Sequence, residues 1–271
     1  MWLPKLILTA AALVLIALLY LLPKVVVDNE QQENASAIGE TTDVELIESH
    51  NQELAEAEEL AIENLKEGFN TDLNPEKSAT FADSLGGLFA SLNFLDSAAL
   101  YYGVAAELDP MLVRWLKAGE SYFEAYSYAV ESEKQQALGE NVRKYFNLAL
   151  ESDPGLYDVK AKMALTFLPS QPMQAVLLLR EVVEQDPENE LGLYNLGLLS
   201  LQSQQFDKAV NRFEALTKSH PENLEGQFYL GVSYSENGDL AKAKEQFELV
   251  KTMDTDPEVQ VTIDEYLEKL K

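Results

Sequence analysis

The sequence predicts an all-α protein in which a solenoid of stacked helix pairs follows a single transmembrane helix. Three observations support this prediction. An uncharged apolar run lies near the N-terminus, similar residues recur thirty-four positions apart in the second half, and the recurring residues are of fixed small or aromatic types. A period of this length is typical of helical repeats, which grow by stacking. The 271 residues therefore need not divide into separate compact domains.

The N-terminal segment is expected to be a membrane anchor. Residues 6–22 carry no charge, and Lys5 and Lys24 flank them together with interfacial aromatic residues. With its apolar flanks the stretch reaches the roughly 20 residues that a span needs. A cleaved signal peptide is the alternative, but the nearest small-residue cleavage pattern, Ala35–Ala37, lies far beyond the apolar run. We therefore assign residues 1–27 as a retained signal anchor.

The orientation of this anchor rests on a small difference in charge. Lys5 and the terminal amine lie before the apolar run, and Lys24 lies after it. The positive-inside rule then places the N-terminus in the cytoplasm. For a Gram-negative source, this predicts an inner-membrane protein whose body lies in the periplasm.

The composition excludes several classes of function. The net charge of −26 opposes a nucleic-acid partner, because proteins that follow phosphates gather lysine and arginine. No cysteine is present, which excludes disulfides, thiolate zinc sites and a lipid anchor on cysteine.

An acidic arm is predicted between the anchor and the repeats. Residues 28–41 are polar and are expected to form a flexible linker, and residues 42–78 an acidic helix followed by a loop. Asn74–Pro75 is expected to end the helix. Its acidic surface is either an ordinary solvated face, or a docking element for a basic partner or a repulsive spacer from anionic lipid. The helix is predicted from apolar residues that recur at near-helical spacing, which are Leu46, Leu54, Ala57, Ala61 and Leu65.

Repeats are visible when the second half is aligned with itself. Leu196–Gly197 aligns with Leu230–Gly231 at the same spacing that separates Ala209 from Ala243. The aromatic residues that follow each alanine, Phe213 and Phe247, align as well. A small residue lets two helices approach closely, and an aromatic ring fills the space beside their crossing. The pattern therefore predicts pairs of packed helices.

This pattern resembles the tetratricopeptide repeat family, whose unit is a pair of antiparallel helices. The resemblance implies a right-handed superhelix of five repeats over residues 79–257, closed by a C-terminal capping helix over 258–271. The expected repeats are 79–112, 113–156, 157–189, 190–223 and 224–257. The matching packing positions are Gly86, Ala98, Tyr102, Gly119, Phe146, Ala175, Gly197, Ala209, Phe213, Gly231, Ala243 and Phe247.

Two repeats depart from the family pattern. The second is longer than the family allows, with the extra residues around Ala129 to Gly139. In the third, Met163 replaces the glycine, and Pro169 and Pro172 stiffen the turn.

The resemblance also predicts a partner-binding groove. In this family the first helix of each pair lines the concave side, which commonly binds a peptide or a helix. An amphipathic helix or apolar peptide is the expected ligand. The lysine, arginine and asparagine residues that clamp a terminal carboxylate in some members are mostly missing. The candidate groove residues, some of which we expect to be core, are Tyr157, Phe167, Leu191, Tyr194, Leu198, Leu201, Phe228 and Val232.

No catalytic or metal site is predicted. His50 and His220 are the two histidines, and neither has a catalytic companion. His50 with Glu53 lacks the three or four converging ligands that a metal needs. Gly86–Gly87 has a packing explanation, so it does not indicate a phosphate loop. We expect no cofactor, no metal and no enzymatic activity.

Three hypotheses for function follow. The first is a membrane-tethered adaptor for a protein partner in envelope assembly, secretion or cytochrome maturation. The second is a periplasmic holdase, associated with the translocon, that accepts many unfolded clients. The third, an enzyme, has no site to support it.

Overall fold

The computed structural model describes residues 54–71 and 74–270. All of them belong to one compact unit, Thr42–Lys271. The regular structure of these residues consists of twelve helices, without strands. The helices are α3 (Glu56–Thr71), α4 (Pro75–Ser91), α5 (Leu95–Leu108), α6 (Leu112–Tyr128), α7 (Ser132–Ser152), α8 (Tyr157–Leu165), α9 (Pro172–Gln185), α10 (Glu190–Gln202), α11 (Phe206–Ser219), α12 (Leu224–Glu236), α13 (Leu240–Met253) and α14 (Pro257–Lys269).

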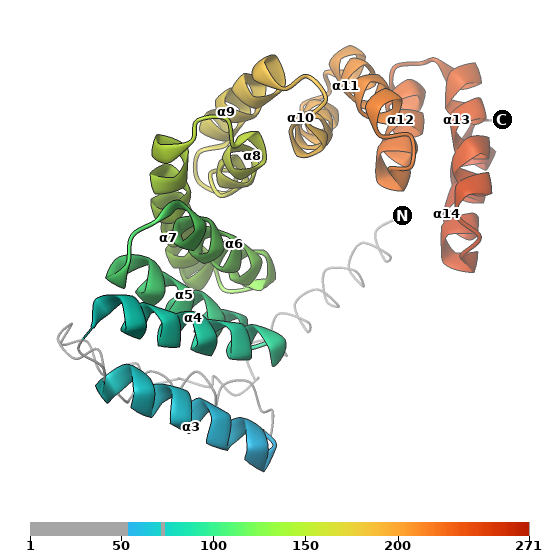
Figure 1. The fold of residues 1–271 in the computed structure, drawn as a ribbon. Coiled ribbons are helices and arrows are strands. Elements are labelled where there is room, and N and C mark those ends of the chain that lie inside the picture. Colours follow the sequence, from blue (N-terminus) through green and yellow to red (C-terminus); the bar gives the residue numbers. More distant parts are fainter. Residues whose placement is uncertain (1–53, 72–73, 271) are drawn as a thin grey trace, which may run out of the picture. The chain divides into compact units, whose positions relative to one another are not determined.

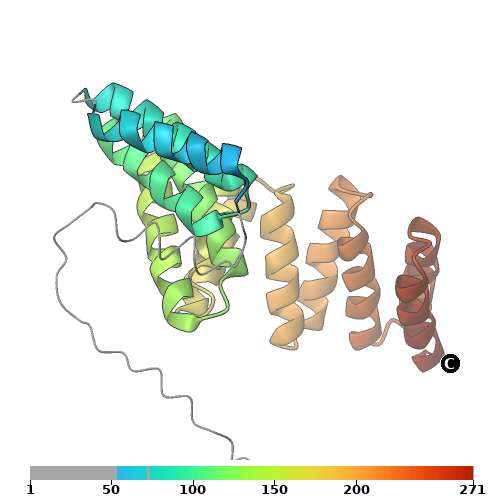
Figure 2. The same ribbon diagram turned by 90° about the horizontal axis from the view of Figure 1, so that it is seen from below.

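Each helix packs mainly against its neighbours in the chain. The pairs α4–α5, α6–α7, α8–α9, α10–α11 and α12–α13 form hairpins, and each hairpin packs against the next. Within this unit the helices follow a curved row, with α6, α8, α10 and α12 on its inner side and α7, α9, α11 and α13 on its outer side (Figure 1). The row of hairpins is also visible from below (Figure 2). The described part of the chain is therefore a solenoid of helical hairpins.

Close helix crossings explain why glycine recurs in the first helix of a pair. A Cβ atom on Gly231 would lie 2.8 Å from the ring of Phe247, and one on Gly197 would lie 2.5 Å from the ring of Phe213. A real side chain does not tolerate such contacts, so each glycine leaves the space that the aromatic ring fills. The alanines at the crossings, Ala98, Ala175, Ala209 and Ala243, are completely buried.

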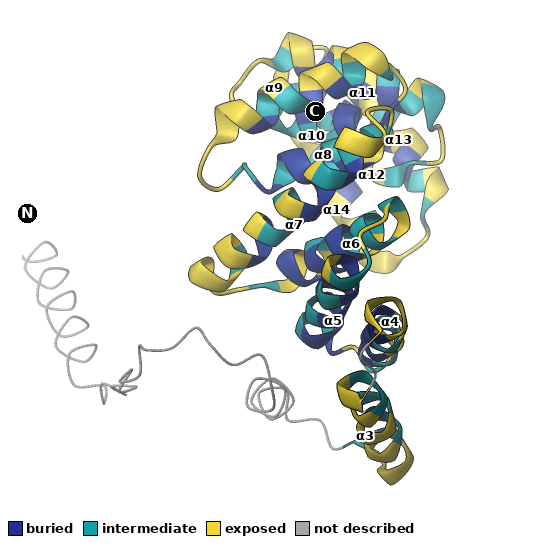
Figure 3. Cartoon of the chain, turned by 60° about the vertical axis from the view of Figure 1, so that its left-hand side comes forward, coloured by how far each residue is buried: buried dark blue, intermediate teal, exposed yellow. Residues whose placement is uncertain are grey.

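The core of the unit is divided into three clusters. The first extends from α3 to α8 and includes Phe89 and Phe146, and a small one joins α8, α9 and α10 around Leu179. The third extends from α10 to α14 around Phe213 and Phe247. Buried residues follow the helix sides that face a neighbour, and exposed residues cover the opposite sides (Figure 3). Stability is thus distributed along the stack.

The loop predicted before the first repeat is too long, and this boundary was wrong. Helix α4 begins at Pro75, inside the predicted loop. Asn74 caps the helix instead of only ending the preceding one: its Oδ1 accepts hydrogen bonds from the amides of Glu76 (2.9 Å) and Lys77 (3.3 Å). Proline suits the first position of a helix, because its missing N–H would have had no partner there.

The residues at near-helical spacing in the acidic arm lie only partly on its packed face. In α3 the buried residue is Ile62, and Leu65 and Phe69 pack on the first cluster together with Leu54, which precedes the helix. Ala57 is exposed. Leu46 lies outside the described residues.

The C-terminal helix α14 covers the last hairpin. Pro257 occupies its first turn, and Asp256 Oδ1 accepts a hydrogen bond from the amide of Glu258 (2.8 Å). Ile263 is buried against the third cluster, and the residues packed around it are Val259, Tyr266, Leu267 and Leu270.

The predicted anchor (1–27) and linker (28–41) lie outside the described residues. Within residues 54–71 and 74–270, none of the helices combines the length and apolar character that a membrane crossing requires.

Candidate partner-binding groove

The predicted groove residues lie on α8, the turn that follows it, α10 and α12. All eight are half-buried. Tyr157 and Leu191 pack against the small cluster of α8 to α10, and Phe167 packs against the first cluster. The other five pack against the third cluster. The structure therefore does not gather all eight into one site, but it groups most of them on α10 and α12.

An unbroken row of aromatic rings joins the inner helices at the C-terminal end. The ring of Tyr194 on α10 meets that of Tyr229 on α12 edge to face, with centroids 5.9 Å apart. Tyr229 meets Phe228 at 5.3 Å, and Phe228 meets Tyr266 on α14 at 5.2 Å. We call Tyr194, Tyr229, Phe228 and Tyr266 the aromatic row.

The aromatic row lies on a fully buried aromatic layer. Tyr229 stacks on Phe213 with centroids 5.8 Å apart, and Phe228 lies 5.9 Å from Phe247. Phe213 and Phe247 have no exposed surface, whereas each member of the aromatic row retains some. The buried layer holds the row in place, and the row in turn presents rigid apolar surface. Rigid aromatic side chains of this kind are favoured in protein interfaces, because little conformational entropy is lost when they bind.

Tyr229 and Tyr266 were not predicted as groove residues. Tyr229 follows Phe228 directly in the sequence. Counting along the helix from the Leu–Gly pair of each repeat selected Phe228 as a groove residue and not its neighbour. Tyr266 was assigned to the capping helix, and its contact with Phe228 depends on how α14 crosses α12. An aromatic pair in the first helix of a repeat is the signal that could have identified Tyr229.

The polar end of Tyr194 is held by a carboxylate. Its hydroxyl donates a hydrogen bond to Glu225, the first-turn residue of α12. Burial, followed by the charge and hydrogen bond of Glu225, raises the pKa of Tyr194 above its ordinary value. The hydroxyl therefore stays protonated at neutral pH, and the Glu225 side chain lies at the edge of the row.

A pocket of about 320 Å³ opens beside the row, between α12 and α14. We call it the α12–α14 pocket. Its apolar walls are Leu224, Phe228, Tyr229, Val250, Val259 and Ile263. The polar residues that line it are Glu225, Glu258 and Thr262. The capping helix thus supplies one wall of a cavity that the repeats alone would leave open.

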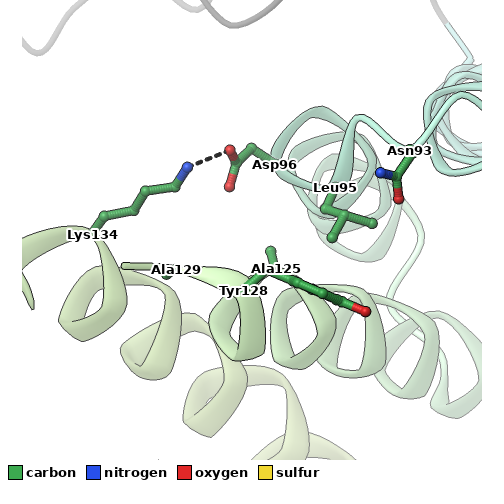
Figure 4. A pocket seen from close by; sticks show the side chains of 7 residues that line it. All are labelled: Asn93, Leu95, Asp96, Ala125, Tyr128, Ala129 and Lys134. Carbon is green, nitrogen blue, oxygen red and sulfur yellow. Dashed lines mark hydrogen bonds and ion pairs between the residues drawn. The ribbon is translucent and has the colours of Figure 1, made fainter. Parts of the chain in front are cut away.

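A second hollow, of about 260 Å³, lies at the turns of the first two hairpins (Figure 4). Lys134 Nζ and Asp96 Oδ2 form an ion pair of 2.6 Å across it, and Tyr128 lines it with 73% of its surface exposed. The extra residues of the second repeat contribute Ala129 and Lys134 to this hollow. Its lining is more polar than that of the α12–α14 pocket and offers no aromatic surface of comparable size.

His220 is the histidine among the described residues, and its ring connects two turns of the chain. His220 Nε2 lies 2.8 Å from the carbonyl oxygen of Glu188, and Nδ1 lies 3.8 Å from Glu190 Oε2. These contacts join the turn before α12 to the turn before α10. His50 lies outside the described residues. In the parts of the chain that the structure describes, no three histidine, aspartate or glutamate side chains converge as metal ligands would.

Comparison with known proteins agrees with the hairpin architecture. Residues 194–256 match the family model described as tetratricopeptide repeat. A tetratricopeptide repeat protein from Parabacteroides merdae has a similar structure, with a TM-score of 0.55 at 14% identity over 84% of this chain and 85% of that one. No curated protein matches the sequence.

Two structures of MamA are similar as well. One has a TM-score of 0.52 at 17% identity, over 65% of this chain and 91% of the MamA chain. MamA from Desulfovibrio magneticus, from residue 41 to its end, gives 0.52 and 17% over 65% of this chain and 94% of that one. At these identities the likeness establishes the fold. By sequence, the match to the tetratricopeptide repeat model covers residues 194–256, from α10 to α13.

Proposed function

We propose that this chain is a membrane-anchored scaffold that binds a protein partner through the inner surface of its C-terminal repeats. The observation that carries the proposal is the aromatic row, which lies half-buried on α10, α12 and α14 above a fully buried layer. Large aromatic side chains are usually buried in a folded core. A continuous row that keeps exposed surface is typical of a binding site.

The geometry of the row favours an extended or helical apolar segment as the ligand. Its four rings join α10, α12 and α14, so a ligand that lies across these helices meets one ring after another. An amphipathic helix with anchors at i, i+3 and i+4 matches such a surface. Catalysis has no comparable support, since function must be argued from a site.

The membrane tether rests on the sequence. In this proposal residues 1–27 are the anchor and residues 28–41 the linker, and the five repeats with their cap stand in the periplasm as part of envelope assembly, secretion or cytochrome maturation. The uncharged run over residues 6–22 supports the anchor. Reporter fusions at the C-terminus test the orientation, because a periplasmic body activates alkaline phosphatase and a cytoplasmic one does not.

Affinity capture from gently solubilised membranes tests the scaffold directly. We expect wild-type protein to retain one stoichiometric partner, and both Tyr194→Ala and Phe228→Ala to lose it. Leu177→Ala is the matched control, because Leu177 is an exposed apolar residue on the outer helix α9. Thermal melts followed by circular dichroism verify that each variant is folded.

The outcomes separate the alternatives. A spread of unrelated clients would identify a holdase instead of a scaffold. Unchanged capture by folded Tyr194→Ala and Phe228→Ala variants would move the site away from the aromatic row.

A further inference from the structure

We infer that the α12–α14 pocket receives an apolar side chain from a partner segment that carries lysine or arginine on both sides of that side chain. This inference rests on the proposed function and specifies the chemistry of the partner. Two features of the pocket lead to it: walls made almost entirely of apolar side chains, and a carboxylate from each of the two helices that form it.

The walls of the pocket suit a single large apolar side chain. Phe228 and Tyr229 form the α12 side, and Val259 and Ile263 the α14 side. Val250 of α13 also lines the pocket and is almost fully buried. A cavity with such walls gains from the removal of water by an aliphatic or aromatic group. A polar side chain would lose its hydration here without finding partners.

The rim of the pocket is negative on both sides. Glu225 belongs to the first turn of α12 and Glu258 to the first turn of α14, and both are exposed. Glu225 accepts the hydrogen bond of Tyr194, which links this side of the rim to the aromatic row. Among the described residues, neither carboxylate has a lysine or arginine nitrogen within salt-bridge distance.

Nearby cations of the chain are engaged elsewhere. Lys251, on α13, pairs with Asp264 of α14. Lys269 lies over the ring of Tyr266, at 4.9 Å from its centroid. The two rim carboxylates therefore remain free to pair with cations of a ligand.

These features define the partner by charge complementarity. An apolar anchor flanked by acidic residues would bring like charges together at Glu225 and Glu258, which opposes binding. An anchor flanked by lysine or arginine would pair with both carboxylates while its side chain fills the pocket. The net charge of the chain, −26, also attracts basic segments at long range.

Binding of a designed peptide tests the charge requirement. The probe is a fluorescent synthetic peptide with one central leucine between pairs of lysines and Gly–Ser ends, titrated with the full-length chain in nonionic detergent and followed by anisotropy. We expect the double variant Glu225→Gln and Glu258→Gln to bind about tenfold more weakly than wild type. Glutamine keeps the acceptor for Tyr194, so the fold of the row is retained.

The matched control changes the same charge elsewhere. Glu236 and Glu248 are exposed on α12 and α13 and do not line the pocket. The double variant Glu236→Gln and Glu248→Gln should bind within about twofold of wild type. An equal loss in both double variants would show that the peptide responds only to the overall charge, and would overturn the inference.

Filling the pocket tests the apolar anchor independently. Thr262 lines the pocket from the exposed side of α14, so Thr262→Trp places an indole inside it. Val261→Trp, at the neighbouring exposed position outside the pocket, is the control. We expect Thr262→Trp to abolish the preference for a central leucine over serine in the probe, and Val261→Trp to retain it. Retention of this preference by a folded Thr262→Trp variant contradicts the inference.

The two proposals can fail separately. If the partner captured from membranes depends on Tyr194 and Phe228 but not on Glu225, Glu258 or Thr262, the scaffold proposal stands and the pocket assignment fails. If the peptide binds in the pocket while membrane capture is independent of Tyr194 and Phe228, the pocket assignment stands and the scaffold proposal fails.

Discussion

The N-terminal hairpins and the C-terminal hairpins use the same packing pattern but treat their aromatic residues differently. In the first cluster, Tyr122 of α6 and Tyr145 of α7 are buried and their rings stack at 5.6 Å. The hydroxyl of Tyr145 donates a hydrogen bond of 3.2 Å to the carbonyl oxygen of Gly103. In the third cluster, Tyr194 of α10 and Phe228 of α12 stay only half-buried.

This difference shows how one packing pattern supports both a buried core and a partly exposed aromatic surface. A small residue and a large ring at each crossing hold the hairpin together in both regions. The remaining aromatic positions are free to vary, and whether they are buried depends on what the next helix covers. Tyr122 and Tyr145 complete the core of the first cluster, whereas Tyr194 and Phe228 belong to the aromatic row.

The largest expected effect compares a fully buried ring with a half-buried one. Phe146→Ala should lower the free energy of unfolding by about 3–5 kcal/mol, because Phe146 is completely buried. Phe228→Ala should cost roughly 1–2 kcal/mol, since part of that ring already contacts water. Urea unfolding followed by circular dichroism measures both. Equal losses would remove the distinction between the two regions.

A smaller effect compares two tyrosine hydroxyls. Tyr145→Phe leaves the buried carbonyl of Gly103 without this donor and should cost about 1–3 kcal/mol. Tyr194→Phe removes a bond to the exposed Glu225 and should cost less than about 1 kcal/mol. The same unfolding measurement applies, and a larger loss in Tyr194→Phe would argue that its hydroxyl is part of the core.

Alkaline pH should destabilise the first cluster. Burial raises the pKa of Tyr122 and of Tyr145, and the nearby Glu107 contributes in both cases. The folded state then holds these protons at a pH where the unfolded chain, with tyrosine pKa values of about 10, releases them. Stability is therefore fully present below about pH 10 and is lost as the pH rises toward the folded pKa values.

Melting temperatures measured from pH 8 to pH 11 would check this effect. In Tyr145→Phe the free energy of unfolding should fall less steeply with pH, by up to about 1.4 kcal/mol per pH unit for the one ionisable hydroxyl that is removed. The melting temperature should fall less steeply for the same reason. Tyr128→Phe, at an exposed position on α6, is the control. A decline that is equally steep in Tyr145→Phe and wild type would contradict the assignment.

The hairpin architecture was predictable from the sequence because its signals are local. Pairs such as Gly197 with Phe213, separated by less than one repeat, encode a close helix crossing. The start of α4 was missed because an Asn–Pro pair can signal the end of one helix as well as the start of the next, and here Asn74 caps α4. Ile62 was missed because the short α3 stripe permits more than one helical register.

The candidate site was less predictable, because it depends on contacts between distant segments. Tyr194 and Phe228 follow from their repeat positions. The contact of Phe228 with Tyr266 and the pocket beside Glu258 depend on the crossing of α12 by the capping helix, which no repeat pattern specifies. Whether a groove residue is half-buried likewise depends on the neighbouring helices that cover it and not on its residue type.

Hydrogen–deuterium exchange of the full chain, with and without the partner captured from membranes, shows directly which helices the partner covers. We expect binding to protect backbone amides of α10, α12 and α14 and to leave α5, α6 and α7 unchanged. Protection confined to α5–α7, or none in α10, α12 and α14, would show that the partner does not bind at the aromatic row.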